Sequence, residues 1–133
     1  LILFNEAGVP CVFWGDLLGS PDSDDLPAVR ELPILMSIRA SAAVGPQHNA
    51  FDNPDVVGFA REGKDEVPGS GCAVILSDRM GAEKTLYVGA RHAGQEWECI
   101  IGDHPSVRVA DDGTLTGVVS DGGLSVYAPR RAQ

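Results

Sequence analysis

The strongest constraint on the fold is a change of hydrophobic period near Asp55. Beyond this residue apolar and polar residues alternate with a period of two, and turns such as PGSG, DDGT and DGG separate the runs. Short strands at intervals of roughly 8–12 residues, joined by turns of this kind, are typical of an antiparallel β-sandwich. The sequence predicts seven strands, at 56–62, 72–78, 85–91, 97–102, 106–110, 115–120 and 124–128.

The preceding part of the chain has a different pattern. The segment LILFNEAG indicates the end of a helix, Pro10–Trp14 an apolar strand, and residues 34–44 an amphipathic helix that starts after Pro33. A strand without alternation needs parallel neighbours and cover on both faces, and one βα unit cannot supply them. We therefore predict that residues 1–45 are the last βα unit of a barrel or doubly wound sheet, and that residues 46–133 are a complete β domain.

Composition excludes several classes of function. The chain carries 10 Lys and Arg against 19 Asp and Glu, a net charge of −9, which predicts binding to neither nucleic acid nor an anionic membrane surface. No apolar run approaches the roughly 20 residues of a membrane-spanning helix. The N-terminal segment has no basic region or cleavage site of a signal peptide, and we interpret Leu1 as an internal position of a longer reading frame.

The three cysteines are Cys11, Cys72 and Cys99. Their odd number and the absence of CxxC spacing argue against a disulfide framework and a zinc site. Each has apolar neighbours in the sequence, so we expect buried, inert thiols. Unpaired cysteines slightly favour the cytoplasm, but the compartment stays open.

Four segments carry motifs in a fixed order: GVPCVFWGDLLGSP, GPQHNAFDNPDVVGFAREG, SGCAVILSDRMGAEKTLYVGARHAGQEWECIIGD and VVSDGGLSVYAP. They resemble the C-terminal portion of the α-amylases of the liquefying Bacillus type and their fungal intracellular relatives. There the first motif is usually G-Y-P-x-V-F-Y-G-D, and the second ends in F-D-x-x-D-V-I-G-W-T-R-E-G. The resemblance implies the last βα unit of a (β/α)8 TIM barrel over residues 1–45, followed by an antiparallel Greek-key C domain over residues 46–133.

The resemblance also implies an activity for the parent protein. Members of the family hydrolyse internal α-1,4 bonds of starch and glycogen with retention, which requires two close carboxylates. The family's catalytic residues would lie upstream of Leu1, so we expect this chain alone to be inactive and the α-glucan to bind the missing barrel. Asp16 follows the predicted strand, where barrel sites form, but we interpret it as a turn residue.

A calcium site is a further implication of the resemblance. The carboxylates of Asp55 and Asp78 and the backbone carbonyl of Pro54 occupy positions that help to hold calcium between barrel and C domain. Calcium takes six to eight oxygen ligands, so these residues would form only part of the shell. From the residues alone, a solvated strand start and a solvated turn explain the two aspartates equally well. The segments NAFD and IRASAAVG depart from the family pattern and weaken the expected surface toward the barrel.

Nine other residues are of types that bind metals, act in hydrolysis or stack on sugars, but their spacing matches no such site. We expect loop roles for Asp22, Asp24, Asp25 and Asp52, and core positions for Trp14 and Trp97. For His48, His92 and His104 we expect a surface or a hydrogen-bonded structural role. An alternative function is a stand-alone carbohydrate-binding or structural β-sandwich without hydrolytic activity. Carbohydrate binding would need a row of exposed aromatic side chains, and aromatic residues make up only 6% of the chain.

Overall fold

The computed structural model describes residues 3–7, 10–12, 16, 18–19 and 28–130. Asp16 and Leu18 are helical. From residue 28 onward the described chain has one α-helix and eight strands, in the order α2 (Leu32–Ser41), β1 (Gln47–Ala50), β2 (Val56–Arg61), β3 (Cys72–Ser77), β4 (Ala82–Tyr87), β5 (Glu96–Ile101), β6 (Val107–Arg108), β7 (Thr114–Val119) and β8 (Leu124–Pro129). A short 3-10 helix, η1 (Ala90–His92), lies between β4 and β5.

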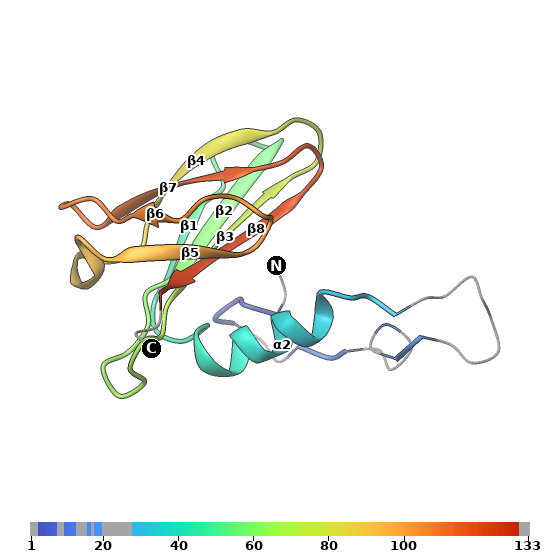
Figure 1. Ribbon diagram of the computed structural model, residues 1–133, viewed down its shortest axis with the longest axis horizontal. Coiled ribbons are helices and arrows are strands. Elements are labelled where there is room, and N and C mark those ends of the chain that lie inside the picture. The colour runs from blue at the N-terminus through green and yellow to red at the C-terminus, as the bar shows by residue number, and fades with distance from the viewer. Residues whose placement is uncertain (1–2, 8–9, 13–15, 17, 20–27, 131–133) are drawn as a thin grey trace.

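The strands form two sheets that pack face to face. The larger sheet has the order β1-β2-β3-β8-β5-β6 and the smaller one consists of β4 and β7, and every pair is antiparallel (Figure 1). Each of the seven predicted strands overlaps an observed one, so the antiparallel sandwich is confirmed. The short strand β1 was not predicted.

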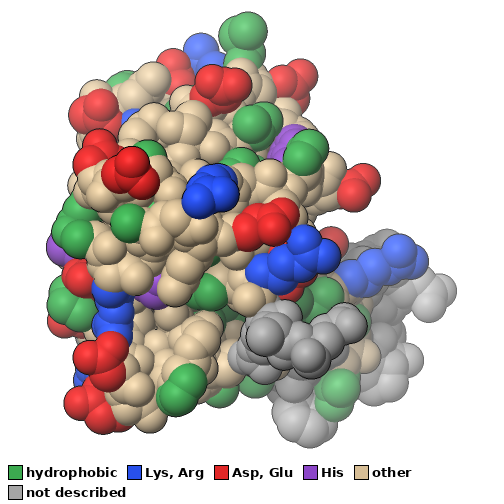
Figure 2. All heavy atoms as spheres, turned by 60° about the vertical axis from the view of Figure 1, so that its left-hand side comes forward, with side chains coloured by type: hydrophobic (Ala, Val, Ile, Leu, Met, Phe, Trp, Pro, Cys, Tyr) green, Lys and Arg blue, Asp and Glu red, His purple; other side chains and the backbone are tan. Residues whose placement is uncertain are grey.

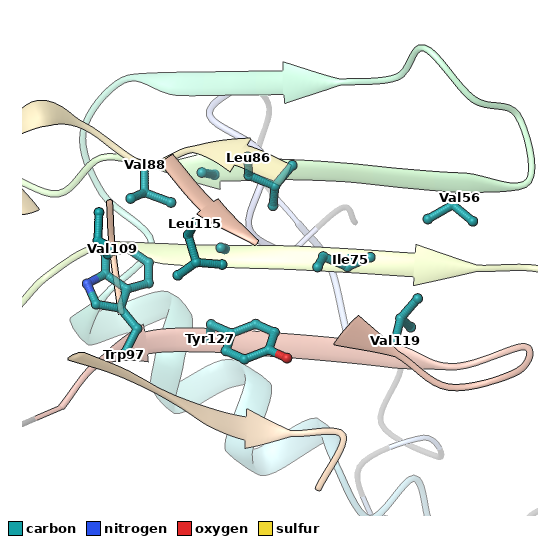
Figure 3. Packing of buried hydrophobic residues seen from close by; sticks show 11 residues of the cluster. Val56, Ile75, Leu86, Val88, Trp97, Val109, Leu115, Val119 and Tyr127 are labelled. Carbon is teal, nitrogen blue, oxygen red and sulfur yellow. The ribbon is translucent and has the colours of Figure 1, made fainter. Parts of the chain in front are cut away.

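A hydrophobic core fills the space between the two sheets (Figure 3). Ile75, Trp97 and Tyr127 of the larger sheet are fully buried against Leu86 and Leu115 of the smaller one. The burial of Trp97 confirms its predicted core position. Tyr127 also joins the sheets by hydrogen bonds, since its hydroxyl donates to the Val118 carbonyl at 3.2 Å and accepts from the Val118 amide at 3.0 Å.

A second hydrophobic cluster covers the opposite face of the larger sheet. Phe59, Val74 and Val126 point to that side, because residues in a strand alternate between faces. They pack against Ile38 of α2 and against Phe4, whose side chain is only 3% exposed. The larger sheet is therefore a middle layer, with the β4–β7 pair on one side and α2 on the other (Figure 1).

The N-terminal part differs from the prediction. Residues 3–7 form a turn and a bend instead of the end of a helix, and residues 10–12 of the predicted strand Pro10–Trp14 have no strand pairing. Cys11 is exposed, so its predicted burial is wrong, whereas Cys72 is buried and Cys99 is half-buried. The physical reason is that no described segment of this chain lies parallel to residues 10–12, and a strand without neighbours has no backbone partners.

Helix α2 is displaced slightly from the predicted range 34–44. It begins at Leu32, with Pro33 in the first turn, where the missing proline N–H would have had no intrahelical partner. It ends at Ser41 because the following carbonyls bond to the β domain: Ala42 accepts from the Gly71 amide at 2.8 Å and Val44 from the Gly63 amide at 2.8 Å.

The connection between α2 and β1 packs closely against Gly63, just after β2. Gly45 has φ +84°, and a Cβ atom there would lie 2.2 Å from the Gly63 carbonyl oxygen. The Gly45 carbonyl accepts a hydrogen bond from Nε of Arg61 at 2.9 Å, and Nη1 of Arg61 donates to the Phe4 carbonyl at 2.9 Å. One buried side chain of β2 therefore fixes both the end of α2 and the N-terminal segment.

Candidate metal site

The structure brings Asp55 and Asp78 together at one end of the sandwich. Asp55 immediately precedes β2 and Asp78 immediately follows β3, and Val56 pairs with Ser77 in the antiparallel register. The Asp78 amide donates to the Asp55 carbonyl at 3.1 Å, which extends the ladder by one step. Both residues are exposed, so their carboxylates face solvent.

A local turn sets the approach of the chain to this site. Oδ1 of Asn53 accepts a hydrogen bond from the Asp55 amide at 2.9 Å, which is the pattern of an Asx-turn. Pro54 lies between them and restricts its own φ to a narrow range. Pro54 is exposed.

The residues present fit part of a calcium shell. The donors are carboxylate and carbonyl oxygens, which calcium prefers, but they are fewer than the six to eight oxygens it takes. Among the described residues no group of three or more His, Cys, Asp or Glu side chains could hold a metal ion. A complete shell would need oxygens from elsewhere.

Asp52 lies near this end of the sandwich but has a different partner. Its Oδ1 accepts a hydrogen bond from Nζ of Lys84 at 2.5 Å, and Lys84 lowers the pKa of the Asp52 carboxyl below its usual value. A general acid for hydrolysis needs a raised pKa. Asp52 is therefore an ion-paired surface residue and a poor candidate for acid catalysis with Asp55.

The three histidines are held in separate places. Nε2 of His48 lies 2.9 Å from Oε2 of Glu62, and Nε2 of His104 lies 3.3 Å from Oγ of Ser120. His92 is buried and hydrogen-bonds through both ring nitrogens, to the Glu62 carbonyl at 2.6 Å and to Oε1 of Gln95 at 2.8 Å. Of the two predicted roles, the hydrogen-bonded one is confirmed for all three.

The remaining candidates are only partly described. Asp16 is helical, so its predicted role as a turn residue is wrong. It is exposed, and its carbonyl accepts a hydrogen bond from the Val29 amide at 2.7 Å. Trp14, Asp22, Asp24 and Asp25 lie outside the described residues. No helix in the described part of the chain is long and apolar enough to cross a membrane.

A surface groove of about 1030 Å³ lies at the opposite end of β2 and β3 from Asp55 and Asp78. Its charges are mixed: Arg91 pairs with Asp65, and Arg130 lies 3.4 Å from Glu96. Acidic and basic side chains are also interspersed over the face seen in Figure 2. Sequence reasoning missed the groove because three separated segments line it. No Trp, Tyr or Phe of the described chain lines it, so it offers no stacking platform.

Comparison with known proteins identifies relatives of this chain, although no protein-family model matches it. The chain is 37% identical over 132 residues to an α-amylase of Geobacillus stearothermophilus and 37% identical over 133 residues to an α-amylase of Bacillus licheniformis. It is 34% identical over 138 residues to the cytoplasmic α-amylase of Escherichia coli. These alignments cover 98%, 97% and 96% of this chain, which confirms the resemblance to α-amylases.

The same relatives are much longer than the chain, which spans about a quarter of their length: 24%, 26% and 28%. Solved structures agree on the fold. An Anoxybacillus α-amylase superposes with a TM-score of 0.64 at 18% identity, over 98% of this chain and 31% of its own. The α-amylase of Geobacillus thermoleovorans in complex with acarbose gives 0.60 at 17% identity, over 98% and 32%.

Proposed function

We propose that this chain, which is homologous to about a quarter of an α-amylase, is part of an enzyme that hydrolyses internal α-1,4 bonds of starch or glycogen with retention. The observation that carries the proposal is the identity of 34–37% to proteins named α-amylase over nearly the whole chain. Residues 1–45 would complete the barrel of the parent, and residues 46–133 would form its C domain.

In this proposal the chain acts by supporting the barrel. Helix α2 contributes Leu32 and Ile38 to the interior, yet it also leaves Ile34 46% and Met36 37% exposed. Much of α2 is exposed, and exposed apolar side chains of this size favour contact with a further layer of protein. The two catalytic carboxylates that retention requires would belong to the rest of the parent.

Calcium is the cofactor that the parent would hold with help from this chain. Asp55 and Asp78 would supply carboxylate oxygens and Pro54 its carbonyl, with the remaining ligands from the barrel. The ion would neutralise two carboxylates that the β2–β3 register places side by side, and it would link the barrel to the C domain. The described geometry supports this because the two aspartates are adjacent and exposed.

The activity is tested with two purified proteins, the parent and the 133-residue chain, by release of reducing sugar from soluble starch. We expect the parent to be active and the chain alone to be inactive. Hydrolysis by the chain alone would contradict our placement of the catalytic carboxylates, and an inactive, folded parent would contradict the proposed reaction. The anomeric form of the first product, followed by NMR, tests retention.

The calcium proposal is tested in the parent by thermal unfolding with calcium and with a chelator. We expect Asp55→Asn and Asp78→Asn to remove most of the stabilisation by calcium. Asp111→Asn is the matched control, because Asp111 is an exposed turn residue away from this site. Equal calcium responses in all three variants and in the unmodified parent would refute the assignment.

The alternative, a carbohydrate-binding domain without hydrolysis, has weaker support. Among the described Phe, Tyr and Trp side chains only Phe51 and Tyr87 are largely exposed, at 51% and 42%. Two side chains do not make a row for successive sugar rings. Co-sedimentation of the isolated chain with insoluble starch would nevertheless favour this function over a supporting one.

A further inference from the structure

A small cavity lies where α2, β2 and the N-terminal segment meet. Its volume is about 370 Å³, and its charged lining residues are Glu6, Arg39 and Arg61. Two guanidinium groups therefore face one small space, in a chain whose net charge is −9. Such a concentration of positive charge needs a physical account.

Arg61 is the buried member of this pair, with only 7% of its surface exposed. Its guanidinium has five N–H donors, of which Nε–H bonds to the Gly45 carbonyl and one Nη1–H to the Phe4 carbonyl. The other three donors have no hydrogen-bond partner among the described residues. No carboxylate oxygen of the described residues lies within 4.0 Å of it, although buried charges are ordinarily paired.

The carbonyls at the end of α2 do not take up these remaining donors. The Ala42 carbonyl already accepts from the amides of Val44 and Gly71, and the Val44 carbonyl accepts from the Gly63 amide. Both carbonyls thus already accept from backbone amides, and neither accepts a hydrogen bond from Arg61. Within the described part of the chain, the other N–H groups of Arg61 therefore have no acceptor.

Arg39 adds a second, less buried set of donors. It lies in the last turn of α2, and its Nη1 donates to the Leu3 carbonyl at 2.5 Å. Its other guanidinium N–H groups have no hydrogen-bond partner among the described residues. Backbone carbonyls thus hold part of each guanidinium group, and its other N–H groups have no partner among the described residues.

Glu6 only partly offsets this charge. Its Oε2 accepts from the Gln47 amide at 3.2 Å, and its own amide donates to Oε1 of Gln47 at 2.6 Å. These two bonds tie Glu6 to β1, and its carboxylate does not come within ion-pair distance of Arg39 or Arg61. Two cations and one anion leave the cavity with a positive excess.

We propose that this cavity binds one oxyanion, a carboxylate or a phosphate group, between Arg39 and Arg61. Guanidinium groups present parallel N–H donors that match the oxygens of these anions, and the resulting hydrogen bonds are stronger than neutral ones. The anion comes either from solution or from an acidic side chain in the rest of the parent. The inference does not depend on the proposed enzymatic function, since it rests on this chain's own residues.

The test uses the 133-residue chain and inorganic phosphate, titrated at constant ionic strength and followed by calorimetry and thermal unfolding. We expect saturable binding with a rise in Tm, and at least a tenfold weaker affinity for Arg39→Gln. Arg130→Gln is the matched control, because Arg130 is an exposed arginine outside the cavity, and it should bind phosphate as the unmodified chain does. Arg61→Lys, which retains the positive charge but loses the paired N–H donors of the guanidinium group, should also weaken binding.

Two results would overturn the proposal. One is the absence of saturable binding to the unmodified chain, and the other is equal affinity in the Arg39→Gln and Arg130→Gln variants, which would indicate general screening. Repeating the titration with the parent separates the sources. Phosphate that stabilises both proteins indicates an anion from solution, whereas phosphate that binds the chain but not the parent indicates a carboxylate of the parent in the cavity.

Discussion

Replacement of Gly45 by alanine tests how tightly α2 is joined to the β domain. The backbone there has φ +84°, which an L-residue adopts at a cost of about 1–2 kcal/mol. The added Cβ would also lie 2.2 Å from the Gly63 carbonyl oxygen and 2.8 Å from its nitrogen and carbonyl carbon. Backbone atoms cannot rotate away as a side chain does, so the two segments must separate.

The separation has an energetic cost of its own. Overpacking of this kind destabilises by about 1–3 kcal/mol, and it strains the hydrogen bond from the Gly63 amide to the Val44 carbonyl. The total loss for Gly45→Ala is therefore about 2–5 kcal/mol in free energy of unfolding. Gly122→Ala is the matched control, because Gly122 has φ +56° and no atom within 4 Å of an added Cβ. Its loss is limited to about 1–2 kcal/mol of backbone strain.

The assay is urea unfolding followed by circular dichroism. With a slope of about 2 kcal/mol per molar urea, Gly45→Ala should lower the midpoint by about 1–2.5 M and Gly122→Ala by less than about 1 M. Equal midpoints for the two variants would show that the close approach of Gly45 to Gly63 has no energetic weight, and would refute the reasoning.

Three further predictions concern the core and the thiols. Phe4→Ala removes a side chain that is 3% exposed, and we expect a loss of about 3–5 kcal/mol and faster amide exchange in α2; Phe51→Ala, at a 51% exposed position, should change neither. Cys11 should react with a thiol reagent in the native protein and Cys72 only after unfolding, so equal rates would contradict the described burial. Burial raises the pKa of Cys72 from 9.0 to about 12, so the unfolded chain releases this proton first and stability should fall as the pH rises from about 9 to 12. Cys72→Ala should flatten that slope in pH-dependent urea unfolding, and an unchanged slope would rule out this cause.

The strands could be predicted because their signals are local. Alternation and turn residues identified all seven predicted strands, but their bounds depend on pairing. The strand predicted at 85–91 is observed at Ala82–Tyr87, because Ala82 pairs with Val119 and Tyr87 with Thr114 in β7. The partner strand β7, which is distant in the sequence and absent from the local pattern, decides where β4 begins and ends.

Strand β1 could not be predicted for a related reason. Its sequence QHNA has no alternation and little apolar character. It is a strand because Gln47 pairs with Arg61 and Ala50 with Gly58, so that β2 imposes the extended conformation. The opposite error occurred at residues 10–12, whose apolar composition predicts a strand that has no neighbour here to pair with.

One candidate site could be found from the sequence and the other could not. Asp55 and Asp78 were singled out by resemblance, and their proximity follows from the register of β2 and β3, two strands that follow one another in the sequence. The cavity between Arg39 and Arg61 depends on three segments separated in sequence and on the conformation of residues 3–6. No spacing of residues along the chain carries that information.

The larger sheet, buried on both faces, bears on where this chain can be cut. A boundary at residue 45 follows the end of the predicted helix, yet a polypeptide starting at residue 46 would present Phe59, Val74 and Val126 to water. These side chains belong to three neighbouring strands, so they would form one continuous, exposed hydrophobic surface on the folded sandwich. A stable fragment must therefore include α2 together with the β domain, because α2 covers one face of the larger sheet.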